Sequence, residues 1–215
     1  MQPHELAHTS VFLDYDGTIS AEDTGVHLLA RLGAPGWREV DAAYSAGEIG
    51  SRMCLLDEWD LLTVDRELLD ATAAEVPIDP DVDALVGDLL RAGAEVTIVS
   101  DGFGFYVERA VGHLGIPIVT NRVNWETGAL EFPNEDRCCA CSSCGTCKQA
   151  PIKDAKRRGR TTVLVGDGTS DRKAAAVADI VYPKDGLAQW CEAFGLGFHR
   201  FGGLDDVRAG LFERQ

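Results

Sequence analysis

The sequence predicts an α/β protein: a Rossmann-like parallel sheet core with helices on both faces, a β-hairpin, and a small helical cap inserted after strand 1. Two observations predict this class. Short apolar runs alternate with segments of helical periodicity, which is typical of a parallel sheet covered by helices. About sixty residues with helical spacing also separate the first strand from the second. We therefore expect a core domain of residues 1–19 and 78–215 and a cap domain of residues 20–77.

The strands of the core are predicted from short buried runs bounded by turn residues. We expect strands at residues 10–14, 94–100, 117–120, 162–167 and 179–182, and a weaker sixth strand at 198–201. We expect helices at residues 81–92, 104–114, 149–158, 171–178 and 186–194. Residues 122–132 hold two extended runs around a Glu-Thr-Gly turn, which predicts a β-hairpin on the edge of the sheet.

The cap is predicted from four segments whose apolar residues are spaced three and four apart. They are residues 24–32, 37–46, 51–62 and 65–75, and Pro77 and Pro80 close the interval. Because the insertion follows the first strand, we expect it to lie over the carboxyl ends of the strands. Open α/β sheets bind their ligands at that edge.

Charge and composition exclude several classes of partner. The 215 residues include 20 basic and 35 acidic side chains, a formal net charge of −15. Such a chain repels phosphate backbones and anionic lipid, so we expect neither nucleic-acid nor membrane binding. No run of apolar residues is long enough to span a bilayer and the first residues lack a signal-peptide pattern, so we expect a cytoplasmic protein. Its expected partner is a small molecule, and both a monomer and a homodimer remain open.

Two carboxylates follow the first predicted strand directly, in the run Asp14-Tyr15-Asp16-Gly17-Thr18. An Asp-rich turn that only caps a helix has the same composition. Two carboxylates this close, however, need a proton or a cation between them. The pair is therefore suited to a nucleophile beside a metal and a proton shuttle.

A second carboxylate pair, Asp167 and Asp171, follows the predicted strand at residues 162–167. If this strand neighbours the first, Asp14 and Asp167 can share a divalent ion such as Mg²⁺, which prefers oxygen ligands. Asp171 opens the next helix, where it can cap the helix and also support the metal site.

A candidate phosphate-binding turn follows the strand at residues 94–100. Ser100, Asp101 and Gly102 offer a hydroxyl and backbone amides at a helix N-terminus, a site suited to a phosphoryl oxygen. Thr18 is grouped with these residues because its hydroxyl lies in the neighbouring turn. Lys148 or Lys153 can supply the cation, and we favour Lys148 because it stands at the start of its helix, facing the crevice.

These elements, in this order, resemble the haloacid dehalogenase-like phosphatases, and the insertion after the first strand resembles their phosphoserine-phosphatase-type branch. The resemblance implies that Asp14 is a nucleophile that forms an aspartyl-phosphate. It implies that Asp16 protonates the leaving oxygen and then activates water, while Ser100 holds a phosphoryl oxygen. It also implies a Mg²⁺ ion bound by the Asp14 side chain, the Asp16 carbonyl and Asp167, near Asp171.

Two further features resemble one group within that family. A Cys-rich run directly before Lys148 and the SDGFGF run at residues 100–105 are similar to phosphatases of 2-hydroxy-3-keto-5-methylthiopentenyl-1-phosphate. Asp23 and Arg52 instead fall where phosphoserine phosphatases place the acidic residue and the arginine that bind an amino acid substrate. A phosphoserine, amino-alcohol phosphate or sugar phosphate phosphatase is therefore the alternative.

Four cysteines, Cys138, Cys141, Cys144 and Cys147, recur at three-residue steps, with Cys139 between the first two. C-x₂-C steps are typical of structural zinc sites, and four thiolates can complete a tetrahedral site. The uniform short spacing also fits an iron–sulfur cluster or free, redox-active thiols. The alternative of another class is a metal- or redox-sensing binding protein built on these thiols. The intact set of Asp14, Asp16 and Asp167 argues against it.

Overall fold

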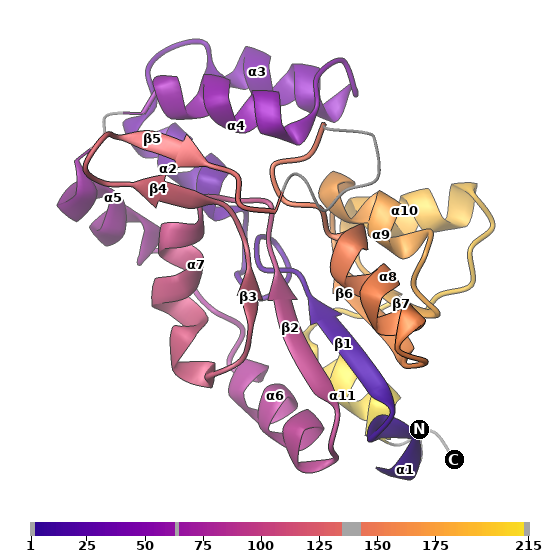
Figure 1. Ribbon diagram of the computed structural model, residues 1–215. Helices are drawn as coiled ribbons and strands as arrows, with labels where there is room; N and C mark the ends of the chain where they lie inside the picture. The colour runs from indigo at the N-terminus through magenta and orange to yellow at the C-terminus, as the bar shows by residue number, and fades with distance from the viewer. Residues whose placement is uncertain (1–2, 63–64, 135–142, 213–215) are drawn as a thin grey trace.

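The computed structural model describes residues 3–62, 65–134 and 143–212 and contains two sheets (Figure 1). The larger is a five-stranded parallel sheet in the order β3-β2-β1-β6-β7, and the smaller pairs β4 with β5. This topology confirms the predicted α/β class. The strands are β1 Thr9–Leu13, β2 Glu95–Val99, β3 Ile118–Val119, β4 Arg122–Asn124, β5 Ala129–Glu131, β6 Thr161–Gly166 and β7 Ile180–Pro183.

Helices cover both faces of the parallel sheet. Those of the core are α1 Pro3–Leu6, α6 Val82–Arg91, α7 Gly104–Val111, α8 Gln149–Arg157, α9 Arg172–Ala175, α10 Asp185–Ala193 and α11 Leu204–Phe212. Alternation along β1 separates the two faces: Val11 and Leu13 belong to the core shared with α6, α7 and α11. Phe12 points the other way and packs with residues of α8, α9 and α10.

The register of the strands brings three loops to one edge of the sheet. Leu13 at the end of β1 pairs with Val165 of β6 and with Ile98 of β2. The residues that follow β1, β2 and β6 therefore meet at the carboxyl ends, where the arrowheads point in Figure 1. These are the segments that begin with Asp14, Ser100 and Asp167.

Between β1 and α6 the chain forms four helices: α2 Thr24–Leu32, α3 Trp37–Ser45, α4 Ser51–Asp60 and α5 Arg66–Ala73. The two ends of this insertion meet, since Ala21 N donates to Pro77 O (2.9 Å) and Asp79 N donates to Ile19 O (2.8 Å). Helices α3 and α4 lie beyond the arrowheads of β1 and β2 (Figure 1). We propose residues 20–77 as a cap over the carboxyl edge of the sheet.

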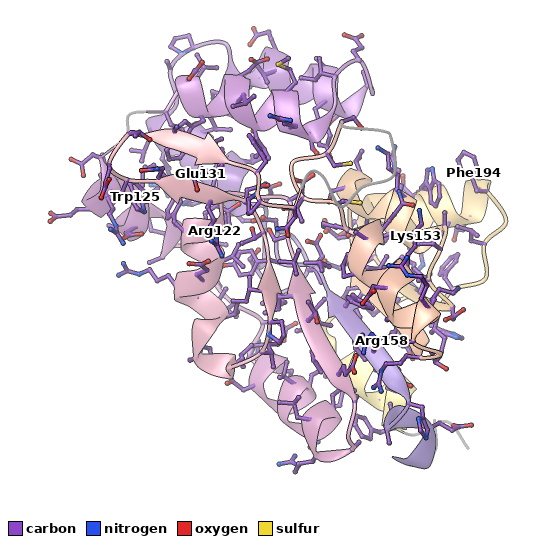
Figure 2. All side chains as sticks on the ribbon, in the orientation of Figure 1. Arg122, Trp125, Glu131, Lys153, Arg158 and Phe194 are labelled. Carbon is purple, nitrogen blue, oxygen red and sulfur yellow. The ribbon has the colours of Figure 1, made fainter. Side chains whose placement is uncertain are left out.

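The hairpin forms, but its predicted place on the edge of the main sheet was wrong. β4 and β5 pair only with each other among the described strands. The hairpin instead packs against the insertion: Trp59 Nε1 of α4 donates to Gly128 O (2.7 Å). Trp125, labelled in Figure 2, packs against Trp59 and Phe105 at centroid distances of 6.4 and 5.4 Å. Burial of these aromatic rings outweighs extension of the sheet.

Three further element predictions need correction. Residues 198–201 form no sixth strand, although His199 N donates to Val181 O (2.9 Å) and Phe201 N donates to Pro183 O (3.4 Å) beside β7. The helix expected at residues 171–178 is divided into a 3₁₀ turn, Thr169–Asp171, and the short α9. Helix α11 was not predicted. None of the helices within the described ranges has both the length and the apolar composition required to cross a bilayer.

Candidate active site

A cavity of about 230 Å³ lies between the carboxyl edge of the sheet and the insertion. Its floor comes from the loops after β1, β2 and β6, and its roof comes from α2, α3 and α4. The floor residues are Asp14, Asp16, Asp101, Gly102, Phe103, Lys148, Asp167, Gly168, Thr169 and Ser170. The titratable residues of the roof are Asp23, Asp41, Tyr44, Cys54 and Glu58.

A buried ion triad stands at the floor of the cavity. Lys148 Nζ lies 2.6 Å from Asp14 Oδ1 and 2.9 Å from Asp171 Oδ1, and the three side chains are at most 4% exposed. Burial alone would lower the pKa of Lys148, but the two carboxylates outweigh it and raise that pKa. Burial, followed by the charge of Asp171, raises the pKa of Asp14. One lysine therefore faces more negative charge than it can neutralise.

Local backbone geometry explains why these carboxylates lie so close. Asp14 N continues the ladder of β1 by donating to Val165 O (2.9 Å). Gly17 has φ +69°, and a Cβ there would collide with the Asp167 carboxylate. A Cβ at Gly166 would collide with Asp171 in the same way. Glycine at position 17 lets the loops after β1 and β6 touch, and glycine at position 166 lets the loop after β6 fold back on its own strand.

Asp14, Asp167 and Asp171 form a candidate metal site, because each offers a carboxylate oxygen and these atoms lie within 4.8 Å of one another. Burial, and then the charge of Asp171, raises the pKa of Asp167 to about 6. Crowded oxygen ligands with raised pKa values are suited to a hard divalent cation such as Mg²⁺. Thr18 Oγ1 donates to Asp167 Oδ1 (3.2 Å), so this hydroxyl contacts the carboxylate site.

Asp16 lies on the other side of the floor, and its two shortest hydrogen bonds come from Thr24 and Tyr106. Thr24 N donates to Asp16 Oδ1 and Tyr106 Oη donates to Asp16 Oδ2, both at 3.0 Å. Burial, and then the charge of Asp23, raises the pKa of Asp16 to about 8. Tyr106 was not predicted from the sequence. It lies in the first turn of α7, and nothing in the local pattern indicates that its hydroxyl reaches Asp16.

The turn after β2 places Ser100 beside Asp16, with Ser100 Oγ 3.5 Å from Asp16 Oδ2. Gly102 N donates to Ser100 Oγ (3.1 Å). The Asp101 carboxylate turns away to Ser51, Asn121 and Thr146. The Asp101 side chain is therefore not a phosphate ligand in this conformation, and only its backbone amide can serve.

Of the two predicted specificity residues, Asp23 lines the cavity and Arg52 does not. Asp23 caps α2 by accepting from Val26 N (2.9 Å) and lines the cavity. The Arg52 guanidinium lies 5.0 Å from the centroid of Phe132. Residues 51, 54, 55 and 58 share the helix face that lines the cavity, and position 52 lies one step round the helix from it.

The two candidate lysines separate clearly. Lys148 reaches Asp14, whereas Lys153, labelled on α8 in Figure 2, lines a different cavity with Glu95 and Arg158. Lys148 directly precedes α8, at the end of the helix that lies next to the site, and its side chain contacts Asp14. Lys153 lies further along the helix.

The cysteine cluster falls partly outside the described residues. Cys138, Cys139 and Cys141 lie there, and the structure says nothing of them. Cys144 and Cys147 are free thiols, and Cys144 Sγ accepts from Lys173 Nζ (3.4 Å). Across the described ranges, the three aspartates are the only group with metal-ligand spacing. The zinc prediction therefore gains no support.

Comparison with known proteins bears on the same residues. Residues 11–176 match the family model of haloacid dehalogenase-like hydrolase. The chain is 27% identical over 210 residues to the 2-hydroxy-3-keto-5-methylthiopentenyl-1-phosphate phosphatase of Exiguobacterium sp. strain AT1b, covering 94% of this chain and 96% of that protein. It is 26% identical over 204 residues to the protein of the same name from Geobacillus kaustophilus, covering 92% of each.

Solved structures share the fold. A phospho-aspartyl intermediate analogue of phosphoserine phosphatase superposes with a TM-score of 0.71 at 18% identity, covering 92% of this chain and 95% of that one. A HAD-family hydrolase from Salmonella enterica serovar Typhi superposes with a TM-score of 0.75 at 15% identity, covering 97% and 72%. At these identities the likeness concerns the fold alone.

Proposed function

Since this chain belongs to the haloacid dehalogenase-like hydrolase family, we propose that it hydrolyses a small phosphate monoester through an aspartyl-phosphate on Asp14. The observation that carries the proposal is the crowding of Asp14, Asp167 and Asp171, whose carboxylate oxygens lie within 4.8 Å of one another. Lys148 pairs with Asp14 and Asp171 at this site, beside the cavity. Relatives named as phosphatases, matched over most of the chain, support the same reaction.

The residues present fit a Mg²⁺ ion. Asp14 and Asp167 offer oxygen ligands, and Asp171 orients the site because its Oδ2 accepts from Asp167 N and Gly168 N (3.3 Å each). When bound, the ion would neutralise charge on the phosphoryl oxygens and on the nearby carboxylates. A bound cation would also relieve the crowding of negative charge, since Asp14 and Asp171 share the single ion-pair partner Lys148 within the described residues.

The first chemical step assigns opposite tasks to Asp14 and Asp16. An Asp14 carboxylate oxygen attacks phosphorus, and the bond from phosphorus to the leaving oxygen breaks. Asp16 gives its proton to that oxygen; burial, which raises its pKa to about 8, favours the protonated form before the step. Tyr106 and Thr24 orient Asp16 for the transfer. Lys148 balances charge beside Asp14.

The second step releases phosphate. Water attacks phosphorus, Asp16 accepts the proton of the water, and the bond between phosphorus and Asp14 breaks. Ser100 Oγ and the amides of the turn at Asp101 and Gly102 would hold the phosphoryl oxygens in both steps. The cap roof would exclude bulk water from the phosphorylated aspartate.

The first candidate substrate is 2-hydroxy-3-keto-5-methylthiopentenyl-1-phosphate or a similar molecule, because relatives at 27% and 25% identity are named as phosphatases of that compound. The second is an amino-alcohol phosphate, and the roof of the cavity favours it. Asp23, Asp41 and Glu58 line the cavity, whereas Lys148 is its only lysine or arginine within the described chain. Acidic side chains around a leaving group favour a cationic one.

Hydrolysis of p-nitrophenyl phosphate, with Mg²⁺ and then with EDTA, tests the reaction. We expect turnover that EDTA removes and added Mg²⁺ restores. A panel of phosphorylated metabolites, including the keto-enol phosphate and phosphoethanolamine, then separates the two candidate substrates. No hydrolysis of any panel member with Mg²⁺ present would contradict the proposal.

A further inference from the structure

The carboxylate of Asp101 joins three segments that are far apart in the chain. The hydroxyl of Ser51, the first residue of α4, donates to Asp101 Oδ2. The backbone N of Thr146 donates to Asp101 Oδ1 at 2.5 Å, and Asn121 Nδ2 donates to the same oxygen at 3.3 Å. The Asp101 side chain therefore connects the insertion, the loop after β3 and the segment before Lys148 by hydrogen bonds.

Direct contacts between the insertion and residues 143–147 reinforce this junction. Gly145 N donates to Ser51 Oγ (3.3 Å), and Arg52 N donates to Ser143 O (3.2 Å). A Cβ at Gly50 would collide with Ser143, and a Cβ at Gly145 would collide with the Asp101 carboxylate. The start of α4 and this segment therefore fit closely, without room for larger residues.

The junction lies next to the chemistry. Thr146 is two residues before Lys148, whose Nζ lies 2.6 Å from Asp14 Oδ1. Ser100, one residue before Asp101, lies beside Asp16. A movement of α4 away from the sheet would break the hydrogen bond from Ser51 and release one side of the support for residues 145–148.

We propose that Asp101 is a positioning residue that couples closure of the cap to placement of Lys148. The inference rests on the proposed function, because Lys148 matters only if Asp14 is the nucleophile. The carboxylate suits the task because its two oxygens accept from Ser51 on one side and from Thr146 and Asn121 on the other. An amide at position 101 has a single acceptor oxygen, so if that oxygen stays with Thr146 and Asn121 the Ser51 hydroxyl loses its acceptor.

The test combines Asp101→Asn, Ser51→Ala and the double variant, with Asp60→Asn, an exposed residue at the end of the same helix, as control. We expect Asp101→Asn to lower kcat about 10- to 100-fold and Ser51→Ala about tenfold. The double variant should resemble Asp101→Asn alone, because both changes break one junction. A purely structural role would instead lower Tm and leave kcat per folded molecule unchanged below the unfolding transition. Asp60→Asn should match the wild type in both.

Hydrogen exchange supplies a readout that does not depend on catalysis. We expect the amides of residues 51–56 and 143–148 to exchange about tenfold faster together in Asp101→Asn and in Ser51→Ala. Losses that multiply in the double variant, or exchange that rises in one segment only, would overturn the inference. If the wild type hydrolyses no phosphate ester, the proposed function fails, and the exchange rates still decide whether Asp101 couples the two segments.

Discussion

The carboxylates at the two ends of strand β2 have opposite electrostatic environments. Glu95 begins the strand and faces Arg158 and Arg160, with Arg158 Nη1 2.8 Å from Glu95 Oε1. Those partners lower the pKa of Glu95 to about 2. Asp101 follows the other end, where burial raises its pKa and Lys148 is the nearest lysine in the cavity. At the amino edge of the sheet, the negative charge of Glu95 is paired with arginines. At the carboxyl edge, the carboxylates outnumber the cations that pair with them.

This difference indicates that the carboxylate at the amino edge serves stability and that those at the carboxyl edge serve the reaction. The paired carboxylate of Glu95 at the amino edge contributes to folding. Glu95 lines a separate cavity, and Asp14 is not among the described residues that line it. Buried carboxylates at the carboxyl edge oppose folding, because each raised pKa means that ionisation is less favourable in the folded chain. We infer that the excess negative charge is kept for a cation, which in turn would attract a phosphoryl group. Each substitution below removes one carboxylate, from the carboxyl edge, from the roof of the cavity or from the amino edge.

The largest effect is expected for Asp14→Asn. An amide is a poor nucleophile, so we expect kcat on p-nitrophenyl phosphate to fall at least about 10⁴-fold. Because the Asp14 carboxylate is crowded by Asp171 and Asp167, the change should leave Tm equal or higher. Steady-state kinetics and thermal unfolding of the same preparation check both parts. A folded, fully active variant would remove Asp14 from the mechanism.

Asp16→Asn should have the next largest effect, lowering kcat about 10²- to 10⁴-fold, the usual contribution of a general acid–base group. The loss should shrink for esters with acidic leaving groups such as p-nitrophenol, since these need little protonation. Comparing p-nitrophenyl phosphate with an alkyl phosphate measures this. Equal losses on both esters would contradict the role of Asp16 as the proton donor.

Glu58→Gln tests the acidic roof. Burial, followed by the charge of Asp23, raises the pKa of Glu58 to about 8, and Glu58 is 7% exposed. If the substrate carries an amine, kcat/KM for phosphoethanolamine should fall about tenfold relative to p-nitrophenyl phosphate. Asp57→Asn, an exposed neighbour on α4, is the matched control. An equal change for both esters would favour the keto-enol phosphate, whose leaving group carries no amine.

Glu95→Gln should have the smallest effect, about 0.2–1 kcal/mol less unfolding free energy at neutral pH, because this ion pair is partly exposed. The pKa of Glu95 is lowered from 4.5 to about 2, so its contribution is complete above 4.5 and disappears as pH falls towards 2. Urea unfolding of both proteins over that range measures the gap, and kcat should not change. A gap that widened with acid would contradict the pairing.

Much of this arrangement follows from the sequence. Apolar runs of five or six residues predict β1, β2 and β6, and the carboxylates directly after β1 and β6 had to meet once those strands were neighbours. The position of Lys148 at the start of its predicted helix favoured it over Lys153, and Lys148 is the one that contacts Asp14.

The features that could not be predicted concern side chains whose partners are remote in the chain. The direction of Asp101 depends on Ser51 and Thr146, about fifty residues away on either side. Arg52 lies on Phe132 because the hairpin packs against α4, and no local pattern indicates where a hairpin will dock. Tyr106 reaches Asp16 only through the turn between β2 and α7.

Trapping the covalent intermediate tests the central claim most directly. The protein is mixed with substrate and Mg²⁺, quenched in acid during turnover, digested, and analysed by mass spectrometry for the peptide that contains Asp14 and Asp16. We predict one phosphoryl group on Asp14, removed by hydroxylamine and absent from Asp14→Asn. Rapid turnover with no phosphoryl group on this peptide, or a phosphoryl group on another residue, would contradict the account.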